Sequence, residues 1–165
     1  PGKEKAPKGA KIINVLSSKD MFDAVKTELK KKFDIVIMAA AVADYIPINP
    51  SKNKIKSSKN ELKISLKKAP KIIDQVKKYQ KDVLLIGFKA ETNLTKNALI
   101  KSAQKKMKES GADIIIANDI GKKYQKNPNY NQVLIVDGKK VTSSNWDKKE
   151  KIVKFIKKEI EKKLE

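Results

Sequence analysis

The sequence predicts an α/β fold whose central sheet is mostly parallel. Four apolar runs of strand length, at residues 34–41, 83–88, 113–119 and 132–137, alternate with segments in which apolar residues recur at helical spacing. This alternation is typical of parallel strands, because the crossover between two of them is usually a helix. The run at 34–41, DIVIMAAA, is continuous, so we expect that strand to be buried on both faces.

Capping and turn residues assign the elements that come before this strand. Residues 1–10 are polar and contain proline and glycine, which predicts a linker, and KIINVL at 11–16 predicts a short strand. Ser17 and Asp20 have the spacing of a capping box, with apolar residues at helical spacing behind them. A helix is therefore expected directly after residue 17.

A loop and a hairpin are predicted in the middle of the chain. Residues 46–60 contain two prolines among Asn, Ser and Lys, and this composition is typical of a loop. ELKISL at 61–66 alternates apolar and polar residues, which predicts a half-exposed strand that forms a hairpin with residues 55–56. Pro70 stands where a short helix begins.

The C-terminal half predicts two further helices and a tight turn. A helix spans residues 93–109 and ends at Gly111, a residue typical of helix C-termini. Asp137 and Gly138 predict a hairpin turn into a last short strand. Ser144 and Asp147 again have capping spacing, which predicts the start of the amphipathic C-terminal helix.

Composition limits the chemistry that this chain performs. Its 165 residues, 39% hydrophobic, correspond to about one globular domain. Cysteine and histidine are both absent, which excludes disulfides and thiol catalysis and removes the commonest general base and metal ligand. No apolar run approaches the ~18–20 residues of a membrane span, and the first residues do not resemble a secretory signal.

The net charge of +20 has two interpretations, since every basic residue is lysine. One is a nucleic-acid-binding module that neutralises phosphates. The other is a general lysine bias on solvated faces, with some cations gathered at a phosphate site. The absence of arginine and the 5% aromatic content argue against base readout and base stacking, so the second interpretation is favoured and nucleic acid is an unlikely partner.

Three predicted strands are followed by small or polar residues at the edge where a parallel sheet binds ligands. These segments are Ala39–Asp44, Gly87–Thr92 and Ala117–Asp119. Each has an ordinary structural interpretation: Asp44 as a turn residue, Glu91 and Thr92 as a helix start, Asn118 and Asp119 as loop residues. Together they predict one crevice. A Rossmann-like nucleotide-binding domain that performs another reaction would show the same crevice, so this alternative stays open.

Six linked motifs resemble one family over residues 11–137. They are AAVADY (40–45), KIK (54–56), ELKISLKKAPKII (61–73), IGFKAET (86–92), Ala103–Met107 and ADIIIAND (112–119). In this order and spacing they resemble the phosphopantothenate–cysteine ligases, the enzymes that join 4'-phosphopantothenate to cysteine in coenzyme A biosynthesis.

The resemblance implies a cytoplasmic homodimer with a Rossmann-like three-layer α/β fold and a small β-hairpin flap. Residues 11–165 would be its nucleotide-binding and dimer-forming portion, behind the linker at 1–10. CTP would be the co-substrate, with Mg²⁺, and the intermediate an acyl-cytidylate; FMN would belong to a separate decarboxylase domain. The family's first strand–turn–helix is expected before residue 1, so we expect the chain alone to be inactive.

The resemblance also assigns residues. Lys54 would be the catalytic lysine, acting on the phosphates and the acyl intermediate, and Asn118 would border the substrate. The metal ligands stay unassigned. Nucleotide-binding positions would be Ala39, Ala40, Ala41, Asp44, Lys54, Ala69, Pro70, Lys71, Ile72, Phe88, Lys106 and Ser110.

Three positions depart from the family pattern. Many relatives have NPDI where this chain has Ala69–Ile72, and a second helix lysine is replaced by Ser110. Lys89 stands where alanine is usual. In place of the helix lysine lost at Ser110, Lys105 or Lys108 would substitute.

Overall fold

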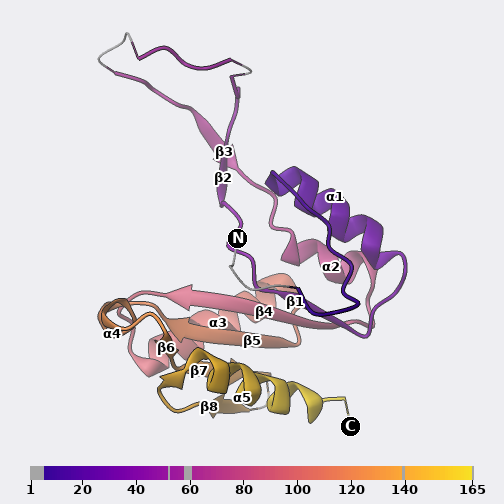
Figure 1. Cartoon of the computed structure of the whole chain (residues 1–165), viewed down its shortest axis with the longest axis vertical. Helices are drawn as coiled ribbons and strands as arrows, with labels where there is room; N and C mark the ends of the chain where they lie inside the picture. Colours follow the sequence, from indigo (N-terminus) through magenta and orange to yellow (C-terminus); the bar gives the residue numbers. More distant parts are fainter. Residues whose placement is uncertain (1–5, 52, 58–60, 139, 165) are drawn as a thin grey trace.

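The computed structural model describes residues 6–51, 53–57, 61–138 and 140–164. It has three layers, with helices on both faces of a five-stranded sheet (Figure 1). The strand order is β1-β4-β5-β7-β8, in which β1, β4 and β5 run parallel and the last two pairings are antiparallel. This confirms the predicted class, a mostly parallel sheet in an α/β fold.

Three parallel strands form the part of the sheet that positions the site. They are β1 (Ile35–Met38), β4 (Leu84–Glu91) and β5 (Ile114–Asp119). Their sequences are rich in isoleucine, leucine and valine, which pack well on both faces of a covered sheet. Met38, the last residue of β1, pairs with Gly87, so β4 extends beyond the end of β1 to Glu91.

The antiparallel strands close the other edge of the sheet. β7 (Val133–Val136) and β8 (Val141–Ser143) are joined by the predicted turn, where Gly138 has φ +81°. A second, two-stranded sheet of β6 (Tyr130–Asn131) and β9 (Asp147–Lys148) lies beside them.

Three helices cover one face of the sheet. They are α1 (Ser18–Leu29), α2 (Ile73–Tyr79) and α3 (Lys96–Ser110), which bury residues such as Leu29, Val76 and Leu99 against it. The capping box that begins α1 is present, as predicted, and α3 ends at Gly111 with φ +68°. Thr95, not Asn93, caps the start of α3.

One helix covers the opposite face. This helix is α5, Lys149–Glu161 (Figure 1). Its Ile152 and Ile160 belong to the same buried cluster as the isoleucines of β4 and β5. Burial of a side chain of this size stabilises the fold by about 1.5–3 kcal/mol. The short helix α4 (Lys122–Lys126) follows β5.

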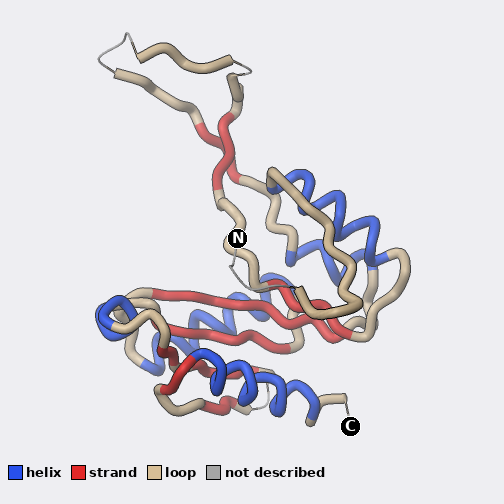
Figure 2. Tube along the Cα trace, in the orientation of Figure 1, coloured by secondary structure: helices blue, strands red, loops and turns tan. Residues whose placement is uncertain are grey.

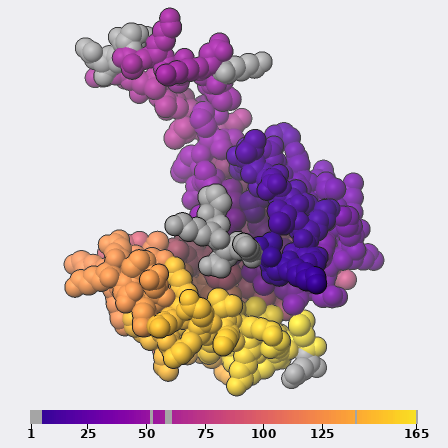
Figure 3. All heavy atoms as spheres, in the orientation of Figure 1, coloured from indigo at the N-terminus to yellow at the C-terminus, as the bar shows by residue number. Residues whose placement is uncertain are grey.

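A two-stranded arm projects from this body. β2 (Tyr45–Pro47) pairs antiparallel with β3 (Leu66–Lys68), and the described residues between them, 48–51, 53–57 and 61–65, extend away from the sheet (Figures 2 and 3). The predicted flap is thus present. However, its paired residues lie at the base of the arm, whereas residues 55–56 and 61–65 form no strand.

Three local predictions were wrong. Residues 11–16 form no strand: their apolar side chains are exposed, and no strand of the described residues pairs with them. β1 is an edge strand among the described residues and is only partly buried. Ser144 does not cap α5, because its buried hydroxyl accepts a hydrogen bond from the Val133 N–H and the helix begins at Lys149.

Part of the predicted linker at 1–10 lies outside the described residues, namely 1–5. Residues 6–10 form no helix or strand. Within the described part of the chain, no helix combines the length and the apolar character needed to cross a bilayer.

Candidate functional site

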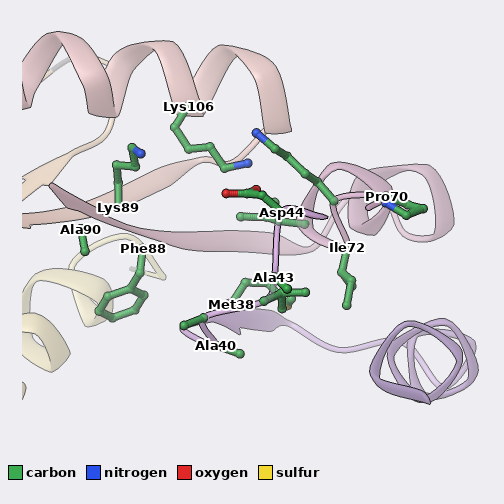
Figure 4. Close-up of a pocket in the computed structure, with 14 residues that line it drawn as sticks. Met38, Ala40, Ala43, Asp44, Pro70, Ile72, Phe88, Lys89, Ala90 and Lys106 are labelled. Carbon is green, nitrogen blue, oxygen red and sulfur yellow. The ribbon is translucent and has the colours of Figure 1, made fainter. Parts of the chain in front are cut away.

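A cavity of about 260 Å³ lies at the carboxyl ends of β1 and β4, the edge that the sequence predicts (Figure 4). It is bordered by the loop after β1, the segment that enters α2, the end of β4 and one residue of α3. The lining residues are Met38, Ala40, Ala41, Val42, Ala43, Asp44, Pro70, Lys71, Ile72, Ile73, Phe88, Lys89, Ala90 and Lys106.

The loop after β1 forms one wall with small side chains. Three alanines and a valine precede Asp44, so the backbone of this wall is open to a ligand. The carbonyl of Asp44 accepts a hydrogen bond from the Ala69 N–H at 2.8 Å. That bond ties the loop to the segment before α2, so both walls keep a fixed separation.

The opposite wall, at Pro70–Ile73, is placed by a close approach of α2 to the sheet. A Cβ added at Gly87 would lie 2.7 Å from Cδ1 of Ile73 and 2.8 Å from Cδ1 of Ile115. A side chain at position 87 would therefore force the ends of these two isoleucine side chains to shift. Gly87 thus packs the wall against the middle of β4, beside the end of β1.

Lys106 of α3 reaches into the cavity, where the carboxylate of Asp44 is also directed (Figure 4). Its ammonium lies 3.2 Å from a carboxylate oxygen of Asp74 in α2, and the side chain is only 14% exposed. A half-buried ion pair of this kind fixes the position of the ammonium group. A solvated surface lysine has no such restraint.

A second cation of the cavity, Lys89, is held in the same manner. Its ammonium lies 3.1 Å from Glu91, and Glu91 also accepts a hydrogen bond from the Ser102 hydroxyl of α3 at 2.6 Å. The Ser102 hydrogen bond and, after it, Lys89 lower the pKa of Glu91, which outweighs the effect of partial burial. Alternation along β4 places Lys89 on the face that α3 covers and Phe88 on the opposite one (Figure 4).

Most of the residues implied by the resemblance line this one cavity. Asp44, Phe88 and Lys106, which come from three separate segments, are among them. The full set is Ala40, Ala41, Asp44, Pro70, Lys71, Ile72, Phe88 and Lys106.

Five implied residues lie outside the lining. Ala39 precedes the wall, Ala69 is buried behind it, and Lys54 is on the arm. Ser110 is 4% exposed, and its hydroxyl donates to the Lys106 carbonyl at 2.7 Å, so it faces the helix rather than the cavity. Asn118, half-buried in β5, pairs with Ala90 but does not reach the lining.

The cavity also contains residues that the motif comparison did not assign. Lys89 is the important one, because it adds a positive charge; the others are Met38, Val42, Ala43, Ile73 and Ala90. A signal was available for Lys89, since it lies in the GFKAET segment at the tip of a predicted buried strand. The ammonium group of a lysine at this place reaches solvent mainly at the edge of the sheet where ligands bind.

Magnesium, which the resemblance implies, has only a partial set of ligands here. Mg²⁺ prefers oxygen ligands and is usually held by one or two carboxylates together with substrate phosphates and water. Asp44 offers one such carboxylate in the cavity, while Asp74 pairs with Lys106. Among the described residues no cluster of three acidic side chains forms a resident site. The residues therefore fit a magnesium ion that comes with the phosphates of a ligand.

Together, the layered, mostly parallel sheet and the cation-bearing crevice at its carboxyl edge define a Rossmann-like α/β class of domain with a candidate ligand site. The chain belongs to the family of the DNA/pantothenate metabolism flavoprotein C-terminal domain, whose family model matches residues 1–164. This confirms the resemblance drawn from the six motifs at the level of the family.

Individual relatives agree with this membership. The chain is 44% identical over 109 residues to the coenzyme A biosynthesis bifunctional protein CoaBC of Thermococcus kodakarensis, over 66% of this chain and 27% of the relative. It superposes with a TM-score of 0.81 and 26% identity on the DNA/pantothenate metabolism flavoprotein from Streptococcus pneumoniae, covering 96% of this chain and 76% of that one. The C-terminal domain of a CoaBC protein matches with a TM-score of 0.75 and 27% identity, over 99% of this chain and 73% of that one.

The chain is shorter than these proteins. It spans 27% to 36% of the length of the first curated relatives, which are bifunctional. What the whole relatives do is therefore not transferred to this chain by similarity alone.

The Glu91 network predicts a pH-dependent stability. Because the pKa of folded Glu91 lies below its ordinary value of 4.5, its ionised form stabilises the fold above that pH, and the stabilisation is lost as the pH falls through the lowered pKa. Glu91→Gln should therefore lower the free energy of unfolding at neutral pH, with a difference from the wild type that shrinks below about pH 4.5. Urea unfolding at several pH values measures this, with the more exposed Glu109→Gln as the control. A difference in the free energy of unfolding between the wild type and Glu91→Gln that stays constant at all pH values would contradict it.

Proposed function

We propose that the chain is the nucleotide-binding portion of a phosphopantothenate–cysteine ligase of coenzyme A biosynthesis. In the first half-reaction the carboxylate oxygen of 4'-phosphopantothenate attacks the α-phosphorus of CTP, and pyrophosphate leaves. In the second, the amine of cysteine attacks the acyl carbon of the acyl-cytidylate, CMP leaves with the bonding electrons, and the amine loses a proton. The product contains a new amide bond.

The observation that carries this proposal is the convergence of Asp44, Phe88 and Lys106 on one crevice. The first half-reaction brings a carboxylate and a triphosphate together, so its main requirement is cations fixed where the negative charges meet. Lys106 is fixed by Asp74, and Lys89 by Glu91. A chain without histidine or cysteine is suited to a reaction that depends on positioned charge.

Within this function we assign Lys89 to the triphosphate. Ser110, which stands where the family has a second helix lysine, is buried and bonded to its own helix, so it supplies no charge to the crevice. Lys89 enters the same crevice from β4, beside Lys106. It therefore takes the place of the missing helix lysine.

The small walls of the crevice are assigned to the rest of the nucleotide. Ala40 and Ala41 leave their backbone open to it, and Pro70–Ile72 form an opposing surface that includes the apolar side chain of Ile72. Mg²⁺, bound to the triphosphate and to Asp44, would screen the charges that repel the attacking carboxylate. The base preference for CTP over ATP follows from the resemblance.

The wider setting follows from the relatives. CoaBC proteins are bifunctional by name, and we assign their other activity to a flavin-dependent decarboxylase domain that works with this chain in the cytoplasm. A nucleic-acid-binding role is not favoured, because family membership and the crevice account for the cations that lie in it.

The arm supports a homodimer. Its large apolar residues are 47% to 61% exposed, namely Tyr45, Ile48, Ile55, Leu62, Ile64 and Leu66. Apolar side chains gathered on a projecting hairpin are typical of an interface, and a second copy of this chain is the partner that the resemblance implies. The arm also carries Lys54, which we assign to the acyl intermediate once the arm covers a nucleotide.

Nucleotide binding is the first prediction of the proposal. CTP with Mg²⁺ at about a hundred times its dissociation constant should stabilise the chain by about 2.7 kcal/mol, which raises Tm by roughly 5–10 °C, with ATP giving less. Lys106→Gln and Lys89→Gln should each weaken CTP roughly ten-fold, since each removes a charge-assisted contact. Lys101→Gln, which changes the charge equally on an exposed turn of α3, should not. Equal weakening by all three variants, or no shift with any nucleotide, would contradict the assignment.

Turnover is the second prediction. The matched solved structures are about a quarter to a third longer, so we expect the 165-residue chain alone to bind CTP without releasing pyrophosphate. A chimaera in which it replaces the matching part of the Thermococcus kodakarensis relative should release pyrophosphate in the presence of phosphopantothenate. Lys54→Gln in the chimaera should accumulate the acyl-cytidylate, whereas Lys63→Gln on the same arm should not. Normal product formation by Lys54→Gln would remove Lys54 from the mechanism.

Association is the third prediction. Sedimentation velocity should show a dimer, and Ile64→Lys together with Leu62→Lys should shift it to monomer, because the two charges oppose burial of the arm. The control is Val153→Lys on α5, which adds a charge at an apolar side chain that is 63% exposed but lies outside the arm. This variant should leave the dimer intact. A wild-type monomer at all concentrations would rule the arm interface out.

A further inference from the structure

A second cavity of about 370 Å³ lies at the carboxyl end of β5 and shares no lining residue with the nucleotide crevice. It is formed by the start of α3, the loop that enters α4, and the strands β7 and β8. Its volume falls in the range of ~300–1,000 Å³ that small-molecule sites usually occupy. The proposed ligase reaction uses none of its residues.

The floor and one side wall of this cavity are apolar, whereas polar side chains such as Gln132 and Ser143 complete its lining. Leu99 and Leu134, 6% and 4% exposed, close its floor, and Leu94 lies at its mouth with 37% exposed. Trp146, the only tryptophan of the chain, forms a side wall. A ligand with a ring or a branched hydrocarbon body would cover this surface.

Both walls are held in place by neighbouring structure. The Trp146 ring stacks on Tyr130 with centroids 6.4 Å apart, and the β6–β9 ladder joins the segments that carry the two rings. On the other side, Asn93 has φ +55° and lies so near Gly121 that a Cβ there would be 2.2 Å from its side-chain oxygen. The loops around the cavity are thus packed against one another and form a shaped site.

The charge at the cavity is positive. Lys96, Lys122 and Lys123 line it, and the Lys123 ammonium lies 4.3 Å from the centroid of the Trp146 ring. Asp119 is the one acid among the described lining residues, and its carboxylate accepts hydrogen bonds from the backbone N–H groups of Asn93 at 2.9 Å and Gly121 at 2.7 Å. These two hydrogen bonds to the loops partly offset the negative charge of Asp119 at the cavity.

We propose that this cavity binds a small amphiphilic anion, with an apolar ring or branched body on the leucine floor and a carboxylate or phosphate against Lys123 and its neighbouring lysines. The apolar floor selects against free inorganic anions, because it gives them nothing to bury. The lysines select against neutral apolar molecules, since a charge-assisted hydrogen bond is roughly twice as strong as a neutral one.

Trp146 fluorescence tests the proposal directly, because no other tryptophan contributes to the signal. The 165-residue chain is titrated with phenylacetate, phenyl phosphate and phenylacetamide, which is neutral but close to phenylacetate in shape. We expect saturable changes in emission with at least one anion, and at least ten-fold weaker binding of the amide. Comparison of the two anions shows whether the site prefers a carboxylate or a phosphate.

Variants separate this site from the general lysine content of the surface. Lys123→Gln should weaken the preferred anion roughly ten-fold, whereas Lys126→Gln, an equal change of charge at the exposed end of α4, should leave it unchanged. CTP should not compete with the anion, so this result is independent of the proposed ligase function. The proposal is overturned if no titration saturates, if the amide binds as well as the anions, if both variants weaken binding equally, or if CTP displaces the anion.

Discussion

The in-register parallel pairing of β1 with β4 is the constraint on which the site depends. Ile35 pairs with Leu84, and Met38, the last residue of β1, pairs with Gly87, so β4 continues past the end of β1. Residues 88–90 of β4 and the loop after β1 therefore enclose one crevice. A slip of one residue would exchange the faces of Phe88 and Lys89. Gly87 contributes to the same geometry, because its missing side chain lets α2 approach β4 beside the end of β1.

The crevice is distinguished from the lysine-rich surface by the way its cations are held. On the surface, pairs such as Lys157 with Glu161 join two exposed side chains of one helix turn, and pairs of this kind contribute little. Lys106 and Lys89 instead pair with acids of the sheet or of another helix, at side chains only 14% and 35% exposed. Their positions are therefore set before a ligand arrives, which lowers the cost of organising charge around a triphosphate.

The sequence predicts the layers better than the details at their edges. Continuous apolar runs, the Ser17 capping box and Gly111 each depend on local patterns, and the structure contains the elements that they predict. Residues 11–16 have the composition of a strand, but a strand needs a pairing partner, which local sequence does not reveal. Ser144 has capping spacing, yet a tertiary contact with Val133 takes its hydroxyl.

At the site, motif comparison places Asp44, Phe88 and Lys106, while the inward direction of Ser110 and the role of Lys89 depend on packing around α3.

The central claim is that the edge of β1 and β4 binds a nucleoside triphosphate. A crystal structure of the chain with CTP and Mg²⁺ tests it most directly. We predict the triphosphate between Asp44, Lys89 and Lys106, with the nucleoside between the Ala40–Ala43 loop and Pro70–Ile72. Density for CTP at any other place, including the Trp146 cavity, with the crevice left empty, would contradict the account.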